Sequence, residues 1–153
     1  MQRFRSWIAL EGGQTLIEFA LIVPLIIVFL FVIVDFGIAL DRRIVLQHAI
    51  REGARYAAVH ANADDIRLRT VNQAQNTIAV ADVVVCYIDG DDEGGSVGDP
   101  GDSVRVSATF AYDLAIVGPV LSGLFQGNAG TIIMTPSATA RLERTVSGAA
   151  ACA

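Results

Sequence analysis

The chain has 153 residues with 11 basic and 16 acidic side chains, a formal charge of −5, and a hydrophobic content of 53%. The pI of about 4.8 and the scattered arginines argue against a nucleic-acid-binding surface. His48 and His60 have no partner at metal-ligand or catalytic spacing, so we predict that the protein is not an enzyme.

The first predicted element is a long apolar segment behind a short charged N-terminus. Residues 19 to 34 contain no charged side chain, and the apolar stretch from 16 to 40 has 25 residues. As a helix it would be about 37 Å long at ~1.5 Å per residue, which is enough to cross a bilayer. A secretory signal peptide has its cleavage site after the apolar region, whereas here Gly12 and Gly13 precede it. We therefore predict a membrane span at about 16–40; the alternative is a buried core helix.

The residues around Gly13 carry a processing pattern. The sequence Gly13-Gln14-Thr15-Leu16-Ile17-Glu18-Phe19 resembles the cleavage site of type IV prepilins and pseudopilins. The resemblance implies that a prepilin peptidase cleaves between Gly13 and Gln14, which makes residues 1–13 a leader. It also implies that Glu18 neutralises the N-terminal amine of a neighbouring subunit. An unpaired carboxylate at the edge of a span costs on the order of 2.5–3.5 kcal/mol; the simpler alternative is that Glu18 is only an interfacial residue.

Three blocks of sequence, at 18–24, 35–37 and 49–58, narrow the family. Together they resemble the N-terminal signature of the TadE-like proteins, which are minor pseudopilin-like components of the tight-adherence (Flp pilus) system. The signature residues in this chain are Phe19, Pro24, Asp35, Gly37, Arg51, Gly53 and Arg55. Within the signature, we interpret Asp35 as a marker of the far membrane interface or as a partner for an arginine of another subunit.

The resemblance also implies a function and a location. The chain would be a single-pass protein of the cytoplasmic membrane that takes part in assembly of a Flp/Tad-type pilus, with its C-terminal domain outside the cytoplasm. Its partners would be the lipid bilayer, a prepilin peptidase, other pilins or pseudopilins and Tad secretion components, with no nucleic acid. The competing interpretation is a membrane-anchored binding module that never enters a filament.

The span is predicted to continue as a stalk, so that residues 14–61 form one helix with its membrane part at about 16–40 and its stalk at about 41–61. Small residues on one face would let another element approach closely; they are Ala49, Gly53, Ala54 and Ala57. We favour this chain's own sheet as that element over another subunit. Pro24 is expected to kink or locally unwind the helix, unless it is simply tolerated in a membrane helix.

Residues 62–153 are predicted to form an extracytoplasmic α+β domain. Asn62 is a suitable N-cap for a second helix to about Val80, whose shared face would contain Leu68, Val71, Gln75 and Ile78. Three segments are typical of strands: 82–89, which we expect to be buried on both faces; 103–112, with one face exposed to water; and 131–143, which contains Pro136 as an interruption. Residues 113–126 form either a short helix or an apolar loop. The predicted fold class is pilin-like α+β, with a long N-terminal helix, a second short helix and an antiparallel sheet of about three strands.

An acidic loop joins the first two predicted strands. Residues 89–102 contain six acidic residues and no basic one, and four of the acids could hold calcium: Asp89, Asp91, Glu93 and Asp99. The position that should be a bidentate Glu in a calcium loop is Pro100. A solvated hairpin loop without metal is therefore the favoured interpretation, and no other cofactor is predicted.

Cys86 and Cys152 are the only cysteines. Outside the cytoplasm two cysteines suggest a disulfide, which would hold the C-terminal tail on a strand. Such a closure could stabilise the fold by about 3–4 kcal/mol. The alternative is a free, buried Cys86.

Overall fold

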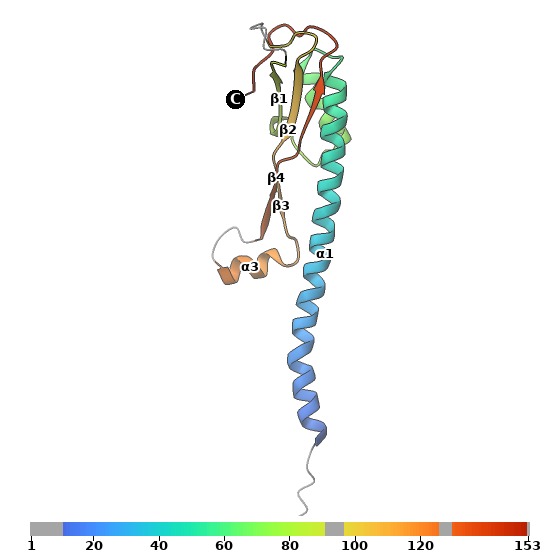
Figure 1. The fold of residues 1–153 in the computed structure, drawn as a ribbon. Helices are drawn as coiled ribbons and strands as arrows, with labels where there is room; N and C mark the ends of the chain where they lie inside the picture. Colours follow the sequence, from blue (N-terminus) through green and yellow to red (C-terminus); the bar gives the residue numbers. More distant parts are fainter. Residues whose placement is uncertain (1–10, 91–96, 126–129, 153) are drawn as a thin grey trace, which may run out of the picture.

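A computed structural model describes residues 11–90, 97–125 and 130–152, and one long helix forms its axis (Figure 1). This helix is α1 (Glu11–Ala57), and the other elements lie along its C-terminal half. They are α2 (Ala63–Gln73), the 3-10 turn η1 (Val80–Asp82), β1 (Val83–Ile88), β2 (Ser103–Ala108), β3 (Phe110–Asp113), α3 (Gly118–Phe125), β4 (Thr131–Met134) and β5 (Ser137–Arg141). The fold is α+β, with the long apolar helix, the second short helix and the antiparallel sheets that the sequence predicts.

Helix α1 changes character along its length. Its 47 residues extend over about 70 Å. Residues 16 to 34 are almost all exposed although they are apolar, and the helix is long and apolar enough to cross a membrane. From Asp35 onward one face becomes buried against the rest of the chain. The helix continues through Pro24 without a break, which corrects the predicted local unwinding and favours a proline tolerated within a membrane helix.

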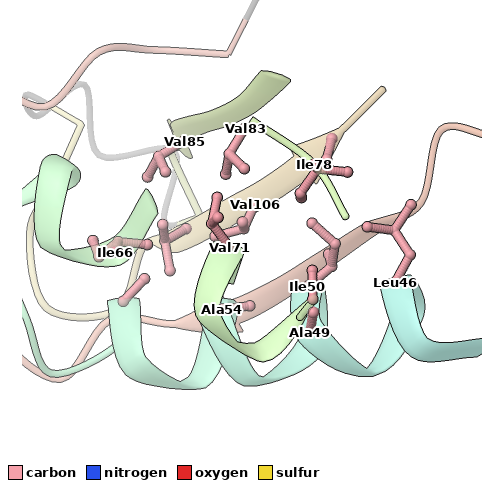
Figure 2. Close-up of a cluster of buried hydrophobic side chains, with 14 of the residues drawn as sticks. Leu46, Ala49, Ile50, Ala54, Ile66, Val71, Ile78, Val83, Val85 and Val106 are labelled. Atoms are coloured by element: carbon pink, nitrogen blue, oxygen red, sulfur yellow. The ribbon is translucent and has the colours of Figure 1, made fainter. Parts of the chain in front are cut away.

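The main sheet has three antiparallel strands in the order β1-β2-β5. Val85 is opposite Val106, and Val106 is opposite Ala138. One face of this sheet packs on α1 and α2, and the side chains between them form the core (Figure 2). β1 was predicted to be buried on both faces, but Val84 is 53% exposed while its neighbours Val83 and Val85 are buried. The prediction was wrong because the helices cover only one face of the sheet.

Helix α2 is shorter than predicted. Its N-cap is Asn62, whose side chain accepts a hydrogen bond from the Asp64 backbone N–H at 3.0 Å. It ends at Gln73, because Gln75 and Asn76 adopt positive φ angles of 54° and 56° that turn the chain. Its buried residues are Ile66, Thr70 and Val71. Of the predicted shared face, Val71 and Ile78 are buried, whereas Leu68 is 50% exposed and Gln75 and Ile78 lie beyond the end of the helix.

A long hairpin leaves the main sheet and continues beside α1 (Figure 1). The predicted strand 103–112 is divided into β2 and β3, and the predicted strand 131–143 is divided at Pro136 into β4 and β5. β3 and β4 pair with each other in a separate two-stranded sheet. Proline has no backbone N–H for a sheet, which explains the interruption. We call β3, α3, β4 and their connections (residues 110–134) the hairpin lobe.

Candidate functional site

The predicted cleavage and assembly residues lie at the N-terminal end of α1. Gly13 and Gln14 belong to the first turns of the helix, and Glu18 and Phe19 lie one turn farther along on its exposed apolar part. The roles assigned to these residues stay predictions.

Asp35 connects α1 to the hairpin lobe. Its side chain is completely buried, and Oδ2 accepts hydrogen bonds from the backbone N–H groups of Ile116 at 2.9 Å and Val117 at 2.7 Å. These N–H groups directly precede α3, where helical N–H groups lack partners within the helix and favour a negative charge. Asp35 Oδ1 has no hydrogen-bond partner in the described part of the chain. Asp35 thus has partners in this chain's own backbone, and its interpretation as a partner for another subunit's arginine stays a prediction.

Gly37 has no packing role within the described residues. A Cβ atom at this position would meet nothing within 4 Å. No contact in the described chain accounts for a glycine here.

Gly53, in contrast, is required by a close approach of two helices. A Cβ atom at this position would collide with the hydroxyl of Thr70 on α2. Thr70 is completely buried and donates a hydrogen bond to the carbonyl of Ile66 at 2.8 Å. The small residues Ala49, Ala54 and Ala57 beside it are buried in the same core. The small-residue face thus packs on this chain's own sheet, as favoured, and also on its own second helix.

Arg51 and Arg55 point outward from the stalk. Arg51 donates from Nε to the Gln47 carbonyl at 3.2 Å, and Arg55 lies 3.8 Å from Glu52 in a mainly solvated ion pair. Glu52 also lies 3.7 Å from Arg69 of α2. Exposed pairs of this kind contribute about 0–1 kcal/mol, so fold stability does not explain the two arginines.

The acidic loop is organised by a residue that the sequence analysis did not select. Asp102 is buried, and its carboxylate accepts hydrogen bonds from the N–H groups of Gly90 at 3.1 Å, Gly98 at 2.8 Å and Asp99 at 3.1 Å. The bonds from Gly90 and then Gly98 lower the pKa of Asp102 below its usual value. The available signal was an aspartate at the end of a glycine-rich turn, where carboxylates often bind backbone N–H groups.

Two of the four residues predicted to bind calcium lie outside the described part of the chain. Asp91 and Glu93 are not among the described residues, while Asp89 and Asp99 are. Within the described ranges, no three His, Cys, Asp or Glu side chains gather as metal ligands. The structure therefore leaves calcium binding as a prediction.

The C-terminal tail is attached to the outer edge of β1. Cys86 and Cys152 form a disulfide with their Cα atoms 4.9 Å apart. Next to the disulfide, the backbone of Tyr87 makes two hydrogen bonds with the tail. Its N–H donates to the Ala150 carbonyl and its carbonyl accepts from the Cys152 N–H, each at 2.9 Å. Burial of Tyr87 raises the pKa of its hydroxyl. The tail thus covers part of a strand edge that would otherwise be open to pairing.

The family comparison matches the long helix and not the elements packed on it. Residues 13–55 match a family model described as TadE-like protein. This segment is similar to the TadE-like family, and it makes up less than half of the chain. No curated protein and no solved structure matches the chain. The TadE-like segment begins at Gly13 and ends within the last turn of α1, before α2 and the sheets. The matched segment lies within the helix that is long and apolar enough to cross a membrane.

Proposed function

We propose that the protein is a minor pseudopilin-like membrane protein that takes part in assembly of a Flp/Tad-type pilus. The observation that carries the proposal is the TadE-like match over 13–55, which coincides with a helix whose apolar residues 16–34 are exposed. Exposed apolar surface of this extent needs a cover of lipid or of apolar helices from other subunits. A membrane protein that later joins a filament would have lipid as the cover before assembly and the apolar helices of other subunits afterwards.

In this proposal a prepilin peptidase removes residues 1–13 and creates a new amine at Gln14. An α-amine has a pKa of about 7.7–8 and is mostly charged at neutral pH. Inside hydrocarbon that charge is costly unless an anion pairs with it. Glu18 of a neighbouring subunit supplies the anion, so that both charges are neutralised when subunits associate.

In the proposed topology the remaining chain then divides into the helix, which ends at Ala57 and not at the predicted residue 61, and an extracytoplasmic domain at 62–153. The Cys86–Cys152 disulfide supports an oxidising compartment for that domain. The exposed Arg51 and Arg55 are available to acidic groups of other Tad components, since neither is held by a strong contact of its own chain.

The leader is tested by N-terminal sequencing of the protein recovered from membranes of a host that builds these pili. The native protein should begin at Gln14, because cleavage follows the glycine. The Gly13→Val variant should retain residues 1–13 and reduce pilus assembly at least tenfold, whereas Gly12→Ala should be processed. Recovery of the native chain with Met1 attached would overturn the proposal.

The role of the glutamate is tested with Glu18→Ala in the same host. We expect pilus assembly to fall at least tenfold, while the Cys86–Cys152 disulfide still forms and reports a folded domain. Asp41→Ala, a change at an exposed acidic residue farther along α1, should assemble normally. Normal assembly of Glu18→Ala would favour the membrane-anchored binding module instead.

A further inference from the structure

The hairpin lobe has one charged residue, Asp113, which is exposed at the end of β3 and accepts a hydrogen bond from the Thr131 hydroxyl. The 27 residues from 114 to 140 include no Asp, Glu, Arg or His in a chain that has no Lys. α3, with the sequence GPVLSGLF, lies in the middle of this stretch. Ile133 of β4 is 70% exposed, and Ile116 before α3 is also exposed. After Asp113 the lobe therefore has no charged residue, and it exposes the apolar side chains of Ile116 and Ile133.

The lobe lies at the depth where α1 would leave a membrane. The exposed apolar residues 16–34 extend over roughly 28 Å as a helix, which equals the hydrocarbon thickness of a bilayer. Asp35 is the next residue, and its carboxylate holds the N–H groups of Ile116 and Val117. The start of α3 is therefore fixed beside the end of the exposed apolar stretch 16–34, which is shorter than the span predicted at about 16–40.

The direction of α3 fits the same position. Figure 1 shows α3 at the end of the hairpin nearest the N-terminal half of α1, running across the direction of α1 and away from it. If α1 crosses the bilayer, α3 runs along its surface. The exposed Arg42 and Arg43 follow Asp35 by two turns of α1, where long basic side chains reach lipid headgroups. Between α1 and β4 is a groove of about 430 Å³ with Phe36, Leu40 and Arg43 in its wall.

We propose that the hairpin lobe is a second membrane contact, in which α3 lies in the lipid interface beside the span. The occupant of the surface that carries Ile116 and Ile133 is the lipid of the adjacent leaflet, which removes these apolar groups from water. The buried hydrogen bonds of Asp35 hold the lobe at that depth, because separating them would leave a carboxylate and two N–H groups unpaired. The proposal rests on α1 spanning the bilayer, which is part of the proposed function, but the TadE-like match does not extend to the lobe.

The test measures the depth of single tryptophans in lipid vesicles. Trp7 is the only native tryptophan, so each probe is introduced into the full chain carrying Trp7→Phe. The probes are Ser122→Trp in α3, Ile133→Trp in β4, Phe29→Trp in the span and Val84→Trp on the exposed side of β1. Each protein is reconstituted at low protein-to-lipid ratio in phosphatidylcholine vesicles whose acyl chains carry bromine at a shallow or a deep position. Disulfide formation between Cys86 and Cys152 checks that each variant folds.

We expect shallow bromines to quench Ser122→Trp and Ile133→Trp at least twofold and deep bromines to quench Phe29→Trp most strongly. Val84→Trp should not be quenched. If Phe29→Trp is quenched while both lobe probes behave like Val84→Trp, the membrane contact is overturned and the span stands. If lobe fluorescence shifts to shorter wavelength only at high protein density, the occupant is another protein copy, and the proposal fails. If Phe29→Trp is also unquenched, α1 does not span, and the membrane part of the proposed function fails with it.

Discussion

At the scale of single residues, Gly53 shows how a signature position is explained by packing. Its backbone is approached by Thr70 so closely that a methyl group has no room, and Thr70 is itself held by the Ile66 carbonyl. Gly37, on the same helix, has open space around it. The packing of this chain therefore explains why a glycine is needed at position 53 but does not explain the glycine at position 37.

We predict that Gly53→Ala destabilises the domain by about 1–3 kcal/mol, because overpacking outweighs alanine's better helix propensity of about 1 kcal/mol. Denaturant unfolding of the full chain in detergent micelles measures the change. Gly37→Ala is the matched control and should lose no stability. Adding Thr70→Ala to Gly53→Ala removes the colliding hydroxyl and should recover part of the loss. A Gly53→Ala protein as stable as the native one would contradict the packing argument.

At the scale of elements, Asp102 closes the loop between β1 and β2. Its carboxylate accepts three backbone N–H groups from the two sides of the loop. These bonds favour the charged form and lower the pKa of Asp102. An unfolded aspartate has a pKa of about 3.9, so the charged carboxylate stabilises the folded state above that pH. The contribution is lost as the pH falls through the lower pKa of the folded state.

We predict that Asp102→Asn destabilises the domain at pH 7, and that the difference from the native protein shrinks below about pH 4. Urea unfolding in micelles at a series of pH values checks this. Asp99→Asn removes the same charge from the same loop without removing the acceptor of the three bonds, and it should have a small effect throughout. A difference for Asp102→Asn that is the same at pH 7 and pH 3 would contradict the charge-based argument.

At the scale of the whole molecule, a single carboxylate joins parts of the chain that are more than 80 residues apart. Apart from Asp35, the hairpin lobe is held by the strand connections around Thr109 and Pro136 and by the packing of Phe110 against the core. Hydrogen bonds to a charged group contribute about 1.5–3 kcal/mol. The lobe's position beside α1 therefore depends strongly on Asp35.

We predict that Asp35→Ala increases hydrogen exchange at the amides of Ile116 and Val117 at least tenfold, since both lose their acceptor. Exchange measured by NMR on the full chain in micelles should leave the amide of Val106 in the main sheet unchanged. Asp41→Ala, at an exposed position on the same helix, is the control and should change neither. Unchanged exchange at Ile116 and Val117 in Asp35→Ala would show that other contacts hold the lobe.

Local patterns in the sequence predicted the elements that depend on neighbouring residues. The α1 apolar run, the Asn62 cap, the alternation of β2 and the break at Pro136 all follow from periodicity, hydrogen-bonding capacity or a missing N–H. The errors in β1 and α2 concern which face is covered. That property depends on elements distant in sequence, so local pattern was insufficient.

The sequence by itself determined that this protein has a membrane-length apolar helix with a TadE-like signature and an α+β region after it, because helix length and residue periodicity are local properties. Only the tertiary structure decided the partners of Asp35, Gly53 and Asp102. Each of these residues acts on backbone or side chains brought near by the fold. The roles of the buried carboxylates and of the glycine without a Cβ atom depend on neighbours that are distant in the sequence, so the sequence alone could not assign them.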